Sequence, residues 1–280
     1  MNQEKQYLSV FHYLKSKILK YFEIVKVHYF SSWAYFTNVI GSGFTVVIRI
    51  WIFTQLYTIS YQASGATIIN GQSVAMVVWG LMLVQSFHGA TRPNVSRLIE
   101  DDVKNGTLAY SISRPYSYIL FQLFAFIGRI IPKLFSNLLI GIIAAFILVG
   151  PVFFSVKSIL LGLILLILGY LLDFLISMII GLVAFWIEDV SALVWIYQKG
   201  QMIFGGAIVP IALFPDYLQN VANYLPFSQL YYGAARLMVN FEMSLFKQFL
   251  LIQLAWILIF ALLSTYLFKK GIKNVSVNGG

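Results

Sequence analysis

The chain has 280 residues, of which 60% are hydrophobic and only 10% are charged, and its mean hydropathy is +0.82. Soluble domains use about 45 to 50% apolar and about 25% charged residues, so the composition excludes a soluble globular protein and indicates an integral membrane protein. The formal net charge is +9, but the basic residues lie at the ends of apolar segments, where they face anionic lipid, so no nucleic-acid partner is expected.

Cysteine is absent, which excludes disulfides, thiolate catalysis and cysteine-ligated metals. The three histidines, His12, His28 and His88, lack zinc-binding spacing, so no metal site is expected. A hydrocarbon core about 30 Å thick needs roughly 20 apolar residues per helix. We therefore expect one membrane domain over residues 1–280.

Residues 1–32 are predicted to be cytoplasmic and interfacial. The segment "FHYLKSKILKYFEIVKVHYF", residues 11–30, has apolar residues at three- and four-residue spacing (Phe11, Leu14, Ile18, Phe22 and Val25), with lysines largely on the other faces. This pattern predicts an amphipathic helix in the plane of the membrane. The segment has neither an uninterrupted apolar core nor a small-residue cleavage site, so no cleaved signal peptide is expected.

Apolar runs then predict an all-α polytopic protein with six transmembrane helices. We expect them at residues 33–60, 73–91, 132–150, 158–186, 192–211 and 249–268. Lys and Arg concentrate in the amino-terminal segment, in the loop after the second span and in the tail "KKGIKN". The positive-inside rule thus predicts two cytoplasmic termini in a multi-pass protein of the inner membrane.

The loop "NVSRLIEDDVKNGTLAYSISRPYSYILFQ", residues 94–122, is the most polar long stretch. Asn94 or Ser96 can cap a helix there, and Gly106 can stop it. Val95, Leu98, Ile99 and Val103 would form its apolar face, Glu100, Asp101 and Asp102 would project towards the cytosol, and Pro115 would begin the next helix. The alternative is that the acids only solvate a loop.

The acids, the following "NGTL" and the "RP" that opens the next helix resemble the first cytoplasmic loop of ABC-2 type permeases, the membrane subunits of a class of ABC exporters. A second stretch, "GGAIVPIALFPDYLQNVANYLPFSQLYYGAARL", resembles that family's segment between spans five and six. Together with the six spans, the resemblance covers nearly the whole chain.

The resemblance implies that residues 94–105 form a coupling helix that docks on a separate ATPase subunit. Its implied contact residues, including those of the turn after the fourth span, are Leu98, Ile99, Glu100, Asp101, Asp102, Lys104, Gly106, Arg114, Glu188 and Asp189. It also implies re-entrant helices before the last span, which form an exit gate containing Gly205, Gly206, Pro210, Pro215 and Pro226. Two membrane subunits, identical or related, would pair with two ATPases.

No phosphate-binding G-x-x-x-x-G-K-[ST] motif occurs, so this chain is expected to be non-catalytic and to carry no cofactor. ATP and Mg would bind to the partner ATPase.

Three charged residues fall within predicted spans: Arg49, Asp173 and Lys199. Such residues cost about 2.5 to 3.5 kcal/mol each at a helix centre, so they should face protein or water. Asp173 is expected to pair with Arg49 or Lys199, and the surplus cation suits a translocation pathway for anionic or zwitterionic cargo. Arg129 and Lys133, where the third span begins, are expected to meet lipid headgroups.

The leading functional prediction is a permease of an ATP-driven exporter that works by alternating access. An ion-coupled secondary transporter using Arg49, Asp173 and Lys199 is the alternative, although no convincing inverted repeat relates the two halves. A membrane hydrolase would need paired carboxylates or histidines, and Asp173 stands alone. A structural scaffold remains a further alternative.

Overall fold

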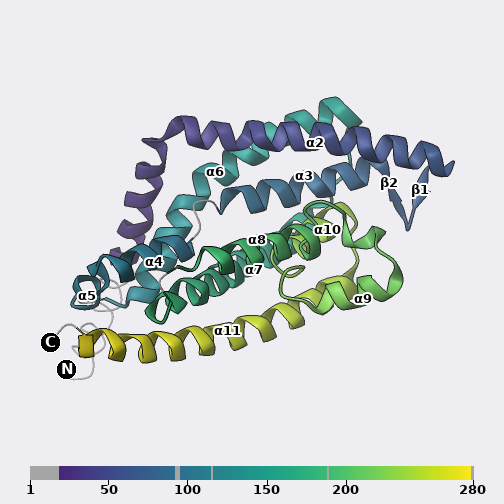
Figure 1. Ribbon diagram of the computed structural model, residues 1–280. Coiled ribbons are helices and arrows are strands. Elements are labelled where there is room, and N and C mark those ends of the chain that lie inside the picture. Colours follow the sequence, from purple (N-terminus) through teal and green to yellow (C-terminus); the bar gives the residue numbers. More distant parts are fainter. Residues whose placement is uncertain (1–18, 92–94, 115, 188, 279–280) are drawn as a thin grey trace, which may run out of the picture.

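The computed structural model describes residues 19–91, 95–114, 116–187 and 189–278, and its architecture is almost entirely helical (Figure 1). The predictions for His12, Phe11, Leu14, Ile18, Asn94, Pro115 and Glu188 lie outside these ranges. Five stretches carry helices long and apolar enough to cross a membrane: Phe36–Ser64, Val74–Lys104, Tyr118–Val149, Val156–Phe185 and Met243–Lys273. The second of these stretches includes residues 92–94, which are outside the described ranges.

The predicted fifth span is not one of these five. Helix α8 (Ser191–Phe204) has 14 residues and is therefore about 21 Å long, shorter than a hydrocarbon core of about 30 Å. It stops before Gly205, and Gly206 has a φ of +68°, which an L side chain rarely adopts. The apolar sequence continues to Ile211, so hydropathy alone did not reveal this end.

The third span also differs from its prediction, because α6 (Tyr118–Val149) begins well before Pro132. Pro132 lies inside the helix and is buried. Proline removes only one backbone hydrogen bond, and helices packed against neighbours in a membrane tolerate this loss. At 32 residues α6 is about 48 Å long, so it extends beyond the hydrocarbon core.

A small hairpin joins the first two spans. Strands β1 (Ile68–Ile69) and β2 (Gln72–Ser73) pair antiparallel, and Asn70 and Gly71 between them both have positive φ. Two positive φ values are typical of the tight hairpin turn that Asn-Gly favours. The Ser73 side chain then accepts a hydrogen bond from the Met76 backbone N–H and caps α3 (Val74–Ala90).

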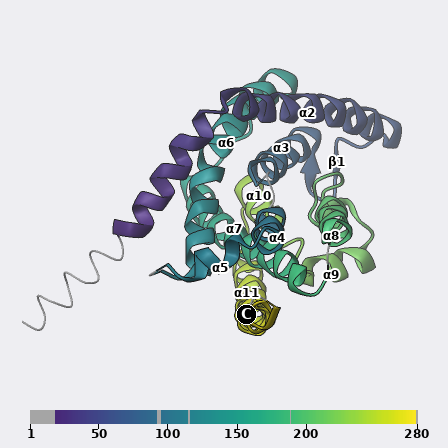
Figure 2. The ribbon, with the colours of Figure 1, turned by 60° about the vertical axis from the view of Figure 1, so that its left-hand side comes forward.

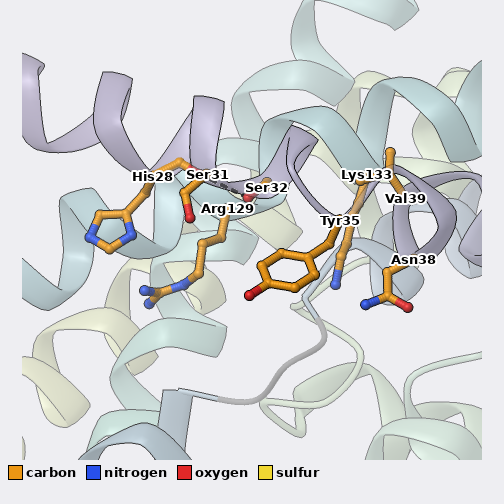
Figure 3. Close-up of a pocket in the computed structure, with 8 residues that line it drawn as sticks. All are labelled: His28, Ser31, Ser32, Tyr35, Asn38, Val39, Arg129 and Lys133. Atoms are coloured by element: carbon orange, nitrogen blue, oxygen red, sulfur yellow. Dashed lines mark hydrogen bonds between the residues drawn. The ribbon is translucent and has the colours of Figure 1, made fainter.

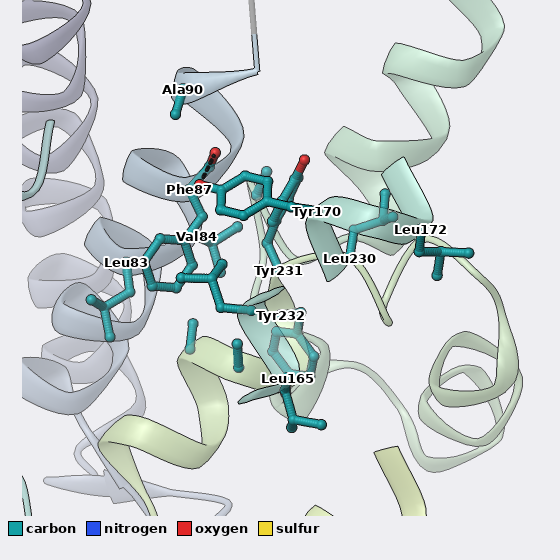
Figure 4. Packing of buried hydrophobic residues seen from close by; sticks show 14 of the residues in the cluster. Leu83, Val84, Phe87, Ala90, Leu165, Tyr170, Leu172, Leu230, Tyr231 and Tyr232 are labelled. Atoms are coloured by element: carbon teal, nitrogen blue, oxygen red, sulfur yellow. Dashed lines mark hydrogen bonds between the residues drawn. The ribbon is translucent and has the colours of Figure 1, made fainter. Parts of the chain in front are cut away.

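The core forms where α10 (Tyr232–Val239) packs against both α7 (Val156–Leu182) and α3, and Figure 4 shows its buried residues. Tyr170 of α7 donates a hydrogen bond to the Phe87 carbonyl oxygen of α3 over 3.1 Å. A Cβ atom at Gly169 would lie 1.8 Å from the Leu230 carbonyl oxygen, so glycine is required for this close approach. Nearly every residue of α10 is buried.

The two ends of the molecule carry different elements (Figure 1). One end holds α4 (Val95–Lys104), α5 (Thr107–Ile112) and the last turns of α11 (Met243–Asn278), with the Tyr118 and Phe268 rings stacked 5.6 Å apart. The other end holds the hairpin and α9 (Asp216–Tyr224). There Asn70 of the hairpin donates a hydrogen bond of 2.9 Å to the carbonyl oxygen of Ala212, in the 3₁₀ turn before α9.

A helix over residues 19–33 turns away from α2 (Phe36–Ser64) and packs on the first half of α6 (Figure 2). A Cβ atom at Gly128 would lie 2.4 Å from the Val25 carbonyl oxygen, so the two backbones touch. The described part of the predicted amphipathic segment is thus helical, and Phe22 on it is exposed.

Candidate functional site

Helix α4 forms where the loop pattern predicted a short amphipathic helix. Val95 and Ile99 are buried on its inner face, and α4 packs along α7. A Cβ atom at Gly181 of α7 would lie 2.7 Å from the Ile99 Cβ and 2.9 Å from the Ser96 carbonyl oxygen. Gly106, with a φ of +69°, separates α4 from α5 as expected.

The three consecutive acids do not all project outwards, and this corrects the prediction from sequence. Glu100 is only 5% exposed; its carboxylate accepts hydrogen bonds from Lys104 Nζ at 2.7 Å and from the Val190 backbone N–H at 3.3 Å. Glu100 therefore fastens α4 to the chain between α7 and α8. The spacing of residues in α4 is compatible with a buried Glu100. The Val190 amide that donates to it lies far away in the sequence, so this contact could not be predicted from α4 alone.

Asp102 also faces inwards, because its carboxylate accepts hydrogen bonds from Tyr118 at 2.7 Å and from Gln122 at 3.1 Å. Both donors lie on the first turns of α6. Asp101 alone of the three acids is exposed. Glu100 thus attaches α4 to the chain between α7 and α8, Asp102 attaches it to α6, and Asp101 lies on the surface.

The remaining predicted contact residues lie around α4. Lys104, Arg114 and Asp189 are exposed, Leu98 is half-buried and Ile99 is fully buried. The Ser191 side chain and backbone N–H hold the pKa of Asp189 below its usual range, so this carboxylate is charged at neutral pH. Arg114 lies over the Tyr110 ring, 4.6 Å from its centroid, which holds the guanidinium against α5.

A surface groove of about 510 Å³ adjoins α4 and was missed from sequence. Val103 and Lys104 of α4 line it together with Phe185, Trp186 and Ile187. Trp186 is exposed although the apolar run placed it at the end of a span, and Ile187 after it is exposed as well. An exposed apolar groove rimmed by charge is typical of protein docking surfaces. The one sequence signal for it is a Trp-Ile pair immediately before the acids of the turn.

Asp173 lies in a buried polar cluster and is only 3% exposed. Its carboxylate accepts hydrogen bonds from the Tyr197 hydroxyl and from Gln201 Nε2, the latter at 2.9 Å. Both donors are neutral side chains of α8. Asp173 therefore attaches the short helix α8 to α7.

The expected ion pair is wrong: within the described chain no salt bridge joins Asp173 to Arg49 or Lys199. Arg49 Nη1 donates to Gln85 Oε1 of α3 at 2.6 Å. Lys199 is exposed and lies 5.4 Å from the centroid of the Trp195 ring. Sequence could not anticipate this result, because the tyrosine and glutamine that donate to the carboxylate lie on a different helix, far from Asp173 in the chain.

The segment between α8 and α10 contains the predicted gate residues. Gly205 and Gly206 are buried after α8, and a Cβ at Gly206 would lie 2.6 Å from the Tyr232 ring. Pro210 and Pro215 flank the short 3₁₀ turn Ile211–Leu213 and precede α9, and Pro226 lies in the turn between α9 and α10. The Tyr232 hydroxyl accepts a hydrogen bond of 2.9 Å from the Ala212 backbone N–H.

Within the described ranges, no group of three or more His, Asp or Glu side chains is placed to hold a metal ion. The arrangement is instead that of a helical membrane domain with one short helix, α4, fastened to two long helices at one end. These features define the class of protein: a polytopic membrane protein with a loop helix presented beside its spans.

A family model described as ABC-2 family transporter protein matches residues 50–279. The match covers most of the chain, and the protein therefore belongs to the ABC-2 transporter family. Permeases of this family are multi-pass membrane subunits that are typically non-catalytic and associate with an ABC ATPase. A comparison with curated proteins finds no match.

Proposed function

We propose that this protein is the permease subunit of an ABC exporter and that α4 is the helix through which a separate ATPase drives it. The supporting observation is that α4 is fastened to both α6 and α7 while its outer face stays open. Arg97, Asp101 and Lys104 are exposed on that face, and the groove lined by Trp186 and Ile187 lies beside it. An apolar groove with mixed charges at its rim suits a protein partner.

The attachments of α4 suggest how a movement would be transmitted. Asp102 bonds to Tyr118 and Gln122 of α6, and Glu100 bonds to the chain that enters α8. Gly181 lets α4 lie directly on α7. A displacement of α4 by closing ATPases would therefore move three membrane helices together, which is what alternating access requires.

The finer features of the assembly belong to the same proposal. The end that holds α4 and the carboxyl terminus faces the cytoplasm of a bacterial inner membrane, as the distribution of Lys and Arg predicts. The stretch from α8 to α9 makes a sixth crossing that is only partly helical, and α9 and α10 form the exit gate. Two membrane subunits assemble with two ATPases, which bind ATP and Mg.

Co-purification from the native membrane tests the proposal. The protein with Arg97→Glu and Asp101→Lys changes two exposed charges on α4 and leaves the internal contacts of Glu100 and Asp102 intact. The matched control is Lys157→Glu, an exposed charge at the start of α7. We expect an ATPase with a Walker motif to co-purify with wild type and control, and to be reduced at least about tenfold with the double variant.

Failure to recover any ATPase in detergent that preserves the protein's own oligomer would overturn the proposal. Equal recovery of the ATPase with wild type and with the double variant would show that the ATPase does not contact the exposed face of α4.

A further inference from the structure

A pocket of about 270 Å³ lies between the helix over residues 19–33 and α6, close to the start of α2 (Figure 3). We call it the interfacial pocket; its polar lining includes His28, Ser31, Ser32, Tyr35, Arg129 and Lys133. We propose that this pocket binds the phosphate group of an anionic lipid. The proposal concerns lipid binding alone and holds whether or not the chain associates with an ATPase.

The charge in the pocket is entirely positive. Arg129 and Lys133 are four residues apart on α6 and therefore project from one face of the helix. Among the described residues that line the pocket none is acidic. Arg129 and Lys133 therefore bring two positive charges to one pocket, and such a pair suits a phosphate group.

Arg129 has a guanidinium nitrogen with no hydrogen-bond acceptor. Its Nη2 atom is buried and makes no hydrogen bond. A buried charged donor left without an acceptor costs more free energy than a neutral one. A phosphate oxygen in the pocket would supply the acceptor, and guanidinium groups bind phosphate through two parallel hydrogen bonds.

Neutral donors surround the two cations. Tyr35 lies between Arg129 and Lys133 in Figure 3, and the Ser31 hydroxyl lines the same pocket. Burial, and then the charge of Arg129, lower the pKa of His28, so its imidazole is neutral at physiological pH and can donate one hydrogen bond. Several donors converging on one space are the arrangement that an oxyanion with three or four oxygens requires.

The depth of the pocket matches that of lipid headgroups. Twenty residues counted back from Val149, the end of α6, reach Ile130, and roughly 20 residues span the hydrocarbon core. Arg129 and Lys133 therefore lie at the boundary of the core on the side that holds α4. The positive-inside pattern places this boundary in the cytoplasmic leaflet, whose anionic lipids attract basic side chains.

The surroundings favour a lipid over a free anion. Tyr35 is 66% exposed and Phe36 beside it 54% exposed. Exposed aromatic rings at this depth contact acyl chains and glycerol groups of the bilayer. A phosphate carrying acyl chains would gain this contact in addition to Arg129 and Lys133, whereas inorganic phosphate would not.

A second pocket, of about 330 Å³, extends this surface inwards. It shares Asn38 and Lys133 with the interfacial pocket and reaches Arg49 and Gln85. Lys133 therefore stands where the two pockets meet. We place the bound phosphate in the outer, interfacial pocket, because the buried donor without an acceptor belongs to Arg129 and because Arg49 already bonds to Gln85.

Native mass spectrometry of the purified full-length protein in mild detergent tests the proposal. The probes are dioleoyl phosphatidic acid, dioleoyl phosphatidylcholine and inorganic phosphate. Arg129→Gln and Lys133→Gln, singly and together, are compared with Lys157→Gln, which removes an exposed charge elsewhere, and with Arg49→Gln in the second pocket. If the double variant does not fold, the single variants Arg129→Gln and Lys133→Gln still test the site.

We expect wild type to bind phosphatidic acid more tightly than phosphatidylcholine, and the double variant to lose about tenfold or more in affinity for phosphatidic acid. Lys157→Gln and Arg49→Gln should bind as wild type does. Equal binding by the Arg129 and Lys133 variants would overturn the site. Inorganic phosphate that binds as tightly as phosphatidic acid would overturn the lipid assignment, and loss of binding in Arg49→Gln alone would overturn its placement.

Discussion

At the scale of single residues, neighbouring acids of one helix perform different tasks. Glu100 is buried and bonded to Lys104 and to the Val190 backbone, whereas Asp101, the next residue, is exposed. Substitution of Glu100 should therefore affect the stability of the protein, whereas substitution of Asp101 should affect partner binding. A block of three charges, which sequence inspection treats as one feature, contains one surface contact and two internal ones.

We predict that Glu100→Ala lowers the thermal unfolding temperature of the purified protein and Asp101→Ala does not. The first change leaves the buried Val190 N–H without its acceptor, and a hydrogen bond to a charged group contributes about 1.5 to 3 kcal/mol. Thermal unfolding in detergent, followed by intrinsic tryptophan fluorescence, measures the difference. An Asp101→Ala protein as unstable as Glu100→Ala would contradict the assignment of these two side chains.

The contribution of Asp173 to thermal stability should come from its hydrogen-bond-accepting oxygen more than from its charge. Asp173→Asn keeps an oxygen for Tyr197 and Gln201, so we expect nearly wild-type thermal stability. Asp173→Leu leaves both donors buried without an acceptor, at about 1 to 3 kcal/mol each, and should unfold at a clearly lower temperature. Equal losses in the two variants would indicate that the negative charge itself is required.

At the scale of elements, the close packing of α4 on α7 depends on Gly181. We predict that Gly181→Ala forces the helices apart, since its Cβ would meet Ile99 and Ser96, and overpacking typically costs about 1 to 3 kcal/mol. If α4 transmits motion from an ATPase, this variant should also reduce the ATPase activity of the purified complex.

The matched control is Gly41→Ala on α2, where an added Cβ meets nothing within 4 Å. Alanine is favoured over glycine in a helix by about 0.5 to 1 kcal/mol, so this control should be as stable as wild type or slightly more stable. A Gly181→Ala protein that behaves like the Gly41→Ala control would show that α4 and α7 do not need to touch.

At the scale of the whole molecule, the two ends should lie on opposite sides of the membrane. The chain has no cysteine, so single-cysteine variants can be labelled without background. We predict that a membrane-impermeant maleimide labels Asn220→Cys, on the exposed face of α9, in intact cells. Asn105→Cys, just after α4, should react only after the cells are opened. Labelling of both positions from the same side would exclude the sixth crossing.

The sequence by itself determined the class of protein, because hydropathy and the distribution of Lys and Arg depend on composition along the chain. It also predicted α4, since the spacing of Val95 and Ile99 and the stop at Gly106 are local signals. The two motifs that resemble ABC-2 permeases agree with the family match over residues 50–279.

Only the tertiary structure decided what each polar side chain contacts. Hydropathy could not show that α8 ends at Phe204, because apolar residues continue through that boundary. Nor could it show that α6 is one helix from Tyr118 onwards, because Arg129, Pro132 and Lys133 interrupt its apolar run. The inward turn of Glu100, the neutral donors around Asp173 and the joint position of Arg129 and Lys133 beside the helix over residues 19–33 bring together residues distant in sequence. Such pairings depend on which helices pack together, and periodicity within one segment carries no information about its neighbour.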